Sequence, residues 1–230
     1  MLNRISICLL TFSWLFLLTG ISIAGDYYSL EPGWNWLYNN NSNQTQSVRV
    51  LDQIQVVRGV ECHVVLVQLS SDNGSFATQS LHRFITKDAE GDVRFHGFTD
   101  LESGASYAMD PPVLILDQPL AMNMVWGTRY NLHLGLDLHG PLLNRHGESF
   151  HVTETYFFDY PDGTVLSLGL VHEHWIYQLD GSKVLLEDDP SIFYAEDIGV
   201  VIDSQLELIN YNSFVAAEVM SWSRLKSDYR

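Results

Sequence analysis

The alternation of apolar and polar residues is the feature that most constrains the fold of this chain. From Arg129 to Leu138, Tyr130 and every second residue after it are apolar, while the residues between them are polar or glycine. Successive side chains of a β-strand point to opposite faces, so a period of two predicts a half-buried antiparallel strand. No segment after residue 24 has a convincing helical period. We therefore expect an all-β fold with at most one short helix, for which residues 214–225 are the best candidate.

Turn sequences separate the expected strands. Val48–Val57 and Val60–Leu69 are apolar and β-branched and meet at Arg58-Gly59, and Val165–Leu179 is a further long strand. Asn, Asp and Gly tolerate the backbone conformations of tight turns. They mark further turns at residues 72–74, 90–92, 161–163 and 180–182. The pattern predicts an antiparallel curved sheet or half-barrel in a single β domain that covers residues 25–230.

A weak internal repeat divides the chain into two pseudo-repeated halves. Leu30 precedes Trp36 by six residues, and Leu120 precedes Trp126 by the same number. Gly33 and Asn123 stand midway in the two segments, and Gly and Asn both tolerate a left-handed backbone. We expect the same tight turn to lead twice into a strand that begins with a buried Trp.

Aromatic residues crowd the segment that follows residue 25. Tyr27, Tyr28, Trp34, Trp36 and Tyr38 all lie within twelve positions of one another. Large aromatic side chains dominate core burial. We expect this segment to be pinned to the core, although such residues also line sugar- or lipid-binding faces.

Three short motifs resemble those of a group of uncharacterised bacterial secreted or envelope β-proteins. The first is Leu-x-x-Gly-x-x-Trp-x-Tyr at residues 30–38, and the second is a Pro-Pro, apolar run and Pro-Leu stretch at residues 111–120. The third is Tyr-Ala-x-x-Ile-Gly-Val-Val at residues 194–201. The chain departs from the group at Ser29, where Pro is usual, and at Asp197, where Gly is usual. The resemblance implies an antiparallel β fold, similar to periplasmic lipoprotein carriers, and no activity.

The first 24 residues have the pattern of a secretory signal peptide. Arg4 precedes an uncharged stretch from Ile5 to Ile23, and Ser22 and Ala24 are small residues at the positions that a signal peptidase reads. An uncleaved membrane anchor is the alternative. We expect cleavage after Ala24 and a periplasmic or secreted product without a membrane span.

Charge and cysteine content exclude several partners and cofactors. The chain has 12 basic and 28 acidic residues, and removal of Arg4 with the signal leaves 11 and 28, a net charge of −17. Such a charge disfavours nucleic acid as a partner. Only Cys62 remains after cleavage, so an intramolecular disulfide and a zinc–thiolate cluster are impossible. We expect Cys62 to be a buried, inert thiol.

The pair His172 and His174 is the main candidate for a metal site. In a strand the two side chains project to one face, about 7 Å apart, so a third ligand from a neighbouring strand would complete a site. The possible third ligands are His133, His139, His146 and His151. A solvent-facing pair on a β-ribbon is the simpler interpretation. We predict no catalytic residue, no cofactor and no tightly bound metal.

Three functions remain open. The first is a non-enzymatic binding or carrier module for a small apolar ligand or a protein partner, which a large apolar cavity would indicate. The second is a metal-dependent hydrolase centred on His172 and His174. The third is a structural surface or assembly subunit, which an exposed strand edge or apolar patch would indicate.

Signal cleavage is directly testable. The protein recovered from the producing cell should begin near Gly25 or Asp26, because the small residues Ser22 and Ala24 fit the peptidase. N-terminal sequencing of the soluble protein measures the start. Recovery of soluble chains that retain Met1 would contradict the prediction.

Overall fold

Twelve β-strands make up all the regular secondary structure in the described part of the chain. The computed structural model describes residues 26–39, 44–71, 79–160, 163–178, 180–203 and 206–212. None of these residues belongs to a helix that is long and apolar enough to cross a membrane. The predicted signal peptide and the helix candidate at 214–225 lie outside these ranges. The strands are β1 (Asn35–Asn39), β2 (Gln44–Val57), β3 (Val60–Ser71), β4 (Gln79–Lys87), β5 (Val93–Asp100), β6 (Ser106–Leu116), β7 (Val125–Leu134), β8 (Leu142–Tyr160), β9 (Gly163–Tyr177), β10 (Lys183–Ala195), β11 (Gly199–Asp203) and β12 (Leu206–Asn212).

The strands form one antiparallel sheet whose two ends meet. Each strand pairs with its neighbour in the sequence, and β1 pairs with β12 as well as with β2. The order of pairing therefore returns to its starting point as a closed ring. The predicted all-β class and the antiparallel curved sheet are confirmed.

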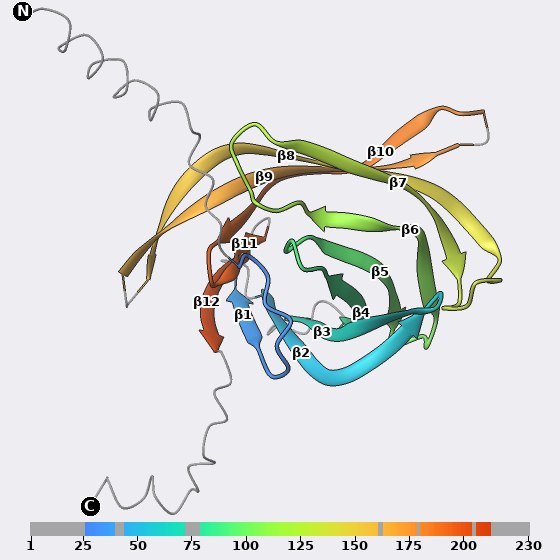
Figure 1. The fold of residues 1–230 in the computed structure, drawn as a ribbon, viewed down its shortest axis with the longest axis horizontal. Helices are drawn as coiled ribbons and strands as arrows, with labels where there is room; N and C mark the ends of the chain where they lie inside the picture. The colour runs from blue at the N-terminus through green and yellow to red at the C-terminus, as the bar shows by residue number, and fades with distance from the viewer. Residues whose placement is uncertain are drawn as a thin grey trace, which may run out of the picture.

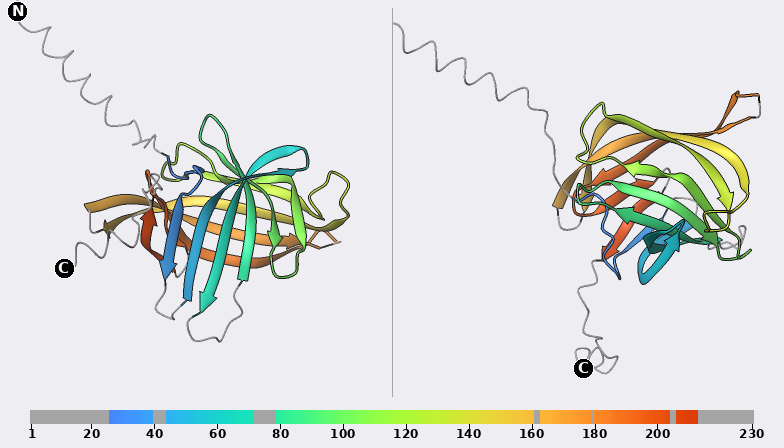
Figure 2. Two further views of the ribbon diagram at one scale, coloured as in Figure 1. Left: turned by 90° about the horizontal axis from the view of Figure 1, so that it is seen from below. Right: turned by 45° about the vertical axis from the view of Figure 1, so that its right-hand side comes forward.

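The sheet is folded into two facing layers. Figure 1 shows β7, β8, β9 and part of β10 above the strands β1–β6. Figure 2 shows that the long strands β8 and β9 run across β1–β4 rather than along them. The hairpins β8–β9 and β9–β10 project beyond the lower layer at opposite ends (Figure 1).

The turn at Arg58-Gly59 is confirmed, whereas the strand predicted at 129–138 has different bounds. Arg58 and Gly59 have φ angles of 49° and 86° and join β2 to β3. Strand β7 begins at Val125 and ends at Leu134, because Gly135 has a φ of 86° and turns the chain. The carbonyl of Leu136 then accepts a hydrogen bond of 2.8 Å from the Arg58 amide. The alternation after Leu134 thus belongs to a loop packed on the β2–β3 turn.

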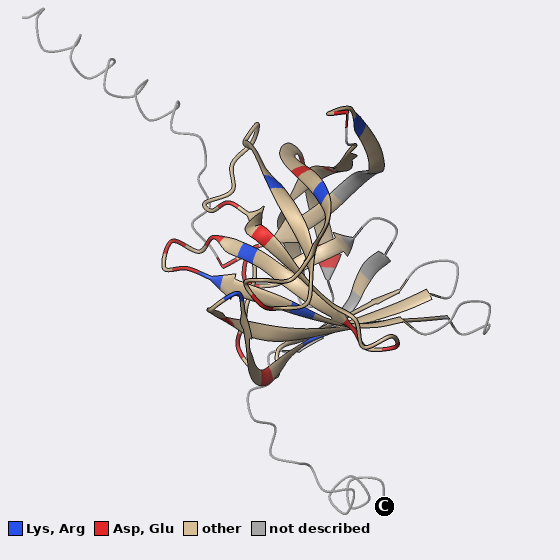
Figure 3. Cartoon of the chain, turned by 90° about the vertical axis from the view of Figure 1, so that its right-hand side faces the viewer, with Lys and Arg blue, Asp and Glu red and all other residues tan. Residues whose placement is uncertain are grey.

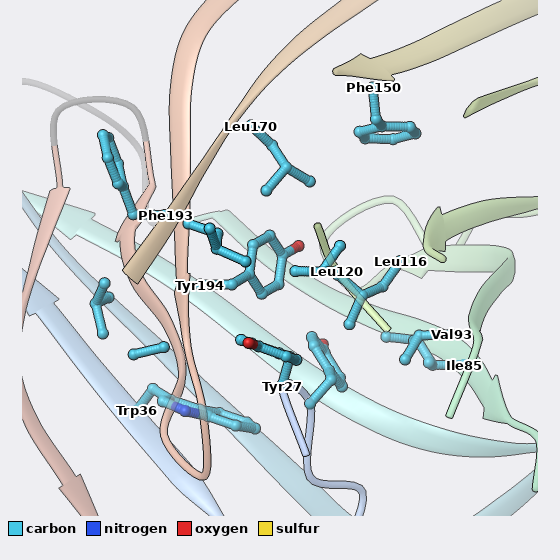
Figure 4. Packing of buried hydrophobic residues seen from close by; sticks show 14 of the residues in the cluster. Tyr27, Trp36, Ile85, Val93, Leu116, Leu120, Phe150, Leu170, Phe193 and Tyr194 are labelled. Carbon is cyan, nitrogen blue, oxygen red and sulfur yellow. The ribbon is translucent and has the colours of Figure 1, made fainter. Parts of the chain in front are cut away.

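The main core fills the space between the two layers. Figure 4 shows Phe150 and Leu170 of the upper layer above Leu120, Leu116 and Tyr27. Each of these five side chains is at most 4% exposed. Burial raises the pKa of the Tyr27 phenol to about 12, and nearby acidic groups add to that effect. The aromatic segment before β1 is therefore pinned to the core, as its composition predicts.

A smaller apolar cluster contains the single cysteine of the described residues. Cys62 is fully buried and packs with Val57, Val64, Phe84 and Ala108. Burial raises the pKa of its thiol to about 12. The thiolate is the reactive form of cysteine, so this thiol is inert at neutral pH, as expected.

The turns that precede β1 and β7 share one local backbone. Gly33 and Asn123 have φ angles of 90° and 67°. The Gly33 amide donates to the carbonyl of Val50, and the Asn123 amide donates to the carbonyl of Val152, each at 2.9 Å. The two halves of the chain therefore begin in the same way, as the sequence repeat predicts.

Each turn leads into a strand whose second residue is a buried Trp. Trp36 of β1 is 2% exposed and Trp126 of β7 is 8% exposed. The indole N–H of Trp36 donates to the carbonyl of Ile198 at 2.6 Å, and that of Trp126 donates to the carbonyl of Leu114 at 3.0 Å. Trp36 is thus tied to the turn between β10 and β11, and Trp126 is tied to the neighbouring strand β6.

Replacement of either tryptophan should be strongly destabilising. We expect Trp36→Ala and Trp126→Ala each to lower the free energy of unfolding by about 3–5 kcal/mol, because each leaves a cavity in the core. Urea denaturation measures the change. Val125→Ala is the matched control, since Val125 is 66% exposed beside Trp126 and should have little effect. A loss below about 1 kcal/mol in both tryptophan variants would contradict their role as core anchors.

Candidate functional site

The two candidate histidines lie on the inner face of β9, beside a buried carboxylate. His174 is paired across the sheet with Glu148 of β8, and His172 is paired with Phe150. Directly opposed residues of antiparallel strands share a face, so both imidazoles lie near Glu148. His172 Nε2 is 3.2 Å from Glu148 Oε2, and the two side chains are 15% and 11% exposed. The interpretation of His172 and His174 as a solvent-facing pair is therefore wrong, because their face is the inner one.

Two further side chains complete a connected polar group. The hydroxyl of Tyr130 donates to Glu148 Oε1 at 2.8 Å. His146 Nδ1 and His174 Nε2 are 2.9 Å apart and share one hydrogen bond. We call Tyr130, His146, Glu148, His172 and His174 the inner polar network. It joins β7, β8 and β9 through their side chains.

Aromatic rings hold the imidazoles in place. The ring of His172 stacks on Phe150, with 4.6 Å between centroids and 8° between planes. The ring of His146 stacks on Tyr130 on one side and on His174 on the other, at 5.3 and 5.2 Å. Because these side chains are stacked as well as hydrogen-bonded, the inner polar network has one defined geometry.

The electrostatics of the network keep Glu148 ionised. Burial raises the pKa of Glu148, but the hydrogen bond and charge of His172, the hydrogen bond of Tyr130 and the charge of His174 outweigh burial and leave the pKa lowered. Burial and the Glu148 carboxylate raise the pKa of Tyr130. Burial lowers the pKa of His146, His174 lowers it further, and Glu148 opposes this only in part. At neutral pH the network therefore contains a carboxylate, a phenol and an uncharged His146.

The arrangement differs from a metal site. Nε2 of His172 is engaged by Glu148, and Nε2 of His174 is engaged by His146. Among the residues that the structure describes, no group of three or more His, Cys, Asp or Glu is arranged to hold a metal ion. Of the proposed third ligands only His146 joins the pair, and His133 instead contacts the carbonyl of Gly140 at 2.8 Å.

An open groove begins where the inner polar network ends. It has a volume of about 1190 Å³ and lies beside the middle of β6 and β7, the start of β8, the end of β9 and the β9–β10 turn. Tyr130 and His146 belong both to its lining and to the network. Nε2 of His146 is buried and has no hydrogen-bond partner among the described residues. Two side chains of the inner polar network therefore border the groove.

The interior of the sheet offers much less space. The pocket between the layers has a volume of about 120 Å³, and Trp36, Tyr38, Ile85 and Tyr194 are among the side chains that line it. Ligand sites for small organic molecules usually measure about 300–1,000 Å³. Of these two spaces, only the groove has room for such a ligand.

Sequence reasoning missed Tyr130 and Glu148 as members of the site and named His146 only as one of four possible metal ligands. A signal existed in the alternation of β8, since His146 and Glu148 occupy the same face as the buried Phe150. Polar residues on an apolar face are buried only with partners. The pattern therefore predicts that His146 and Glu148 are buried with polar partners, but it does not predict which strand supplies those partners.

The lowered pKa of His146 predicts a loss of stability in mild acid. An unfolded imidazole titrates near pH 6.5, so below that pH the unfolded chain binds a proton that folded His146 does not. The free energy of unfolding should therefore fall as the pH drops from about 7 to about 5. His146→Asn should make this decline shallower. His82 and His96 also have pKa values lowered by burial, so some decline remains.

Chemical denaturation at a series of pH values measures this dependence. His139→Asn is the control, because His139 is exposed and lies outside the network. An identical pH dependence in the native protein and His146→Asn would show that His146 does not contribute.

No protein family model, no curated protein and no solved structure matches this chain. The function is therefore inferred from the geometry of the groove and of the inner polar network.

Proposed function

We propose that this protein is an exported, non-enzymatic binding module that holds its ligand in the groove lined by β6, β7, β8 and β9. The observation that carries the proposal is the contrast between the groove, about 1190 Å³, and the interior pocket, about 120 Å³. A ligand of ordinary size fits the first space and not the second.

The lining of the groove favours an amphipathic or polar ligand over a purely apolar one. Asn131 and Asn144 offer hydrogen-bonding groups, and Leu142, Leu143 and Ile176 offer apolar contact. Leu142 and Leu143 are 48% and 43% exposed, so they have apolar surface left to bury. Sites of this mixed kind use the apolar contact for affinity and the polar groups for orientation.

The chemistry of the inner polar network supports binding rather than catalysis. Glu148 accepts hydrogen bonds on both oxygens, from Tyr130 and from His172. Its lowered pKa makes it a poor proton acceptor at neutral pH. Cys62, the candidate thiol nucleophile, belongs to a separate apolar cluster and has a pKa of about 12. The network therefore supplies rigid polar side chains at the border of the groove.

Filling the groove should abolish ligand binding. Asn144→Trp places a large ring in the groove from an exposed position, so the fold should tolerate it. We expect members of a small-molecule fragment library to bind the native protein and not Asn144→Trp. Saturation-transfer NMR measures binding of each fragment.

Val125→Trp is the matched control for this experiment. It adds a ring of the same size at an exposed position of β7 that is not part of the groove lining. Fragments that bind the native protein should bind this variant equally. Fragments that bind all three proteins alike, or none of them, would overturn the proposal.

A further inference from the structure

Three basic side chains lie on the face of β7–β10 opposite the inner polar network. Arg129 and Arg145 immediately precede Tyr130 and His146 in their strands, so their side chains point to the other face. Arg145 is paired with Tyr177 of β9, and Tyr177 is paired with Lys183 of β10. We call Arg129, Arg145 and Lys183 the outer basic patch.

Aromatic rings fix two of the three cations. The guanidinium carbon of Arg129 lies 5.4 Å from the ring centre of Tyr177, and Lys183 Nζ lies 4.6 Å from the ring centre of Trp175. The two rings are themselves in contact, with centroids 6.5 Å apart. A cation held over a ring loses less conformational entropy when it binds an anion. The patch is therefore partly organised before a ligand arrives.

The described side chains supply no carboxylate to neutralise the patch. Arg58, Lys87 and Arg94 each form an ion pair with an aspartate, whereas the three cations of the outer basic patch form none with the described acidic groups. They are consequently available to an external anion.

The acidic groups nearest to the patch already have partners. Glu173 lies two residues before Trp175 on the same face and accepts a hydrogen bond of 3.3 Å from Ser149. Asp180, in the β9–β10 turn, accepts hydrogen bonds from the amide and hydroxyl of Ser182. Asp110, in the groove lining, is paired with Arg58 at 2.7 Å. Figure 3 views this end of the molecule and shows the acidic positions in red and the basic positions in blue.

The spacing of the cations indicates an extended ligand. The patch reaches from β7 to β10, three strand spacings or about 14 Å. A single carboxylate or phosphate group cannot contact cations that far apart. An extended chain with repeated negative charges can contact all of them.

The environment of the rings favours a carbohydrate over a nucleic acid. Binding of single-stranded nucleic acid uses open aromatic faces on which bases stack. One side of Trp175 lies against Gly147, where an added Cβ would be 2.6–2.9 Å from the indole, and Lys183 lies over the ring. The amides of Asn131 and Asn144 line the adjoining groove and suit hydroxyl groups. Arg129 and Arg145 also line the groove, and Lys183 lies next to it because it is paired with the lining residue Tyr177. We propose that the ligand of the groove is an acidic polysaccharide whose carboxylates are bound by Arg129, Arg145 and Lys183, an inference that rests on the proposed function.

The net charge of the protein affects how strongly it binds a polyanion and how the affinity depends on salt. The chain has a net charge of −16, so the surface around the patch repels a polyanion at long range. Salt screens this repulsion and also the attraction of the exposed cations. Affinity is therefore modest, and its dependence on salt reflects the balance of these two effects.

The test uses fluorescein-labelled alginate oligosaccharides, a polyuronate, with the full mature chain and EDTA present to remove divalent cations. Fluorescence anisotropy measures binding at several salt concentrations. We expect the native protein to bind and the triple variant Arg129→Gln, Arg145→Gln, Lys183→Gln to bind at least about tenfold more weakly. The single variant Arg145→Gln keeps both cation–ring contacts and should show a smaller loss.

Arg49→Gln is the control, because Arg49 is an exposed arginine of β2 away from the patch, and its binding should equal that of the native protein. Absence of alginate binding, an equal loss in Arg49→Gln, or tighter binding of single-stranded DNA of the same charge would each overturn the inference. If fragments bind in the groove but alginate does not bind, the inference of an acidic polysaccharide is overturned. The proposal that the protein is a binding module then still stands.

Discussion

The hydrogen bonds between β1 and β12 are the constraint on which the rest of the structure depends. They join the first strand of the described chain to the last, from Asn35 opposite Asn212 to Asn39 opposite Glu207. With this pairing every strand has a neighbour on both sides, and the inner face of the sheet carries the main core. Each side chain that points inward must then be apolar or carry its own polar partner.

The inner polar network follows from that requirement. Glu148 is on the inner face, and an unpaired buried carboxylate would cost several kcal/mol. Tyr130 and His172 each satisfy one of its oxygens, and the cross-strand position of His174 adds a nearby imidazole. These hydrogen bonds offset the cost of burying the carboxylate, and Phe150 stacks on His172. The network lies between the packed interior and the groove, so Tyr130 and His146 border the proposed ligand site.

The local features of the fold could be predicted from the sequence. The turn at Arg58-Gly59 and the paired openings at Gly33 and Asn123 depend on residues that tolerate a left-handed backbone, and the structure has these turns. The prediction that the strand continues to Leu138 was wrong. Gly135 ends the strand, whereas the alternation of apolar residues continues into the loop that follows.

The site could be predicted only in part. His172 and His174 were identified as a pair on one face, which their spacing requires. Their burial was not predicted, because it depends on which strand lies opposite. Glu148 is 24 residues from His172, and no local period encodes that pairing. Likewise the patch of Arg129, Arg145 and Lys183 arises from the register of four strands rather than from a run of basic residues.

Because β1 pairs with β12, the same strand pairings could form with either half of the chain coming first. The first strand begins opposite the residue where the last one ends, so a short linker could join the two at Asn35 and Asn212. A new start at the turn of Asn123 would resemble the original start at Gly33, because the two turns share one backbone conformation. A circularly permuted chain of this kind would keep every strand pairing while its second half was synthesised first.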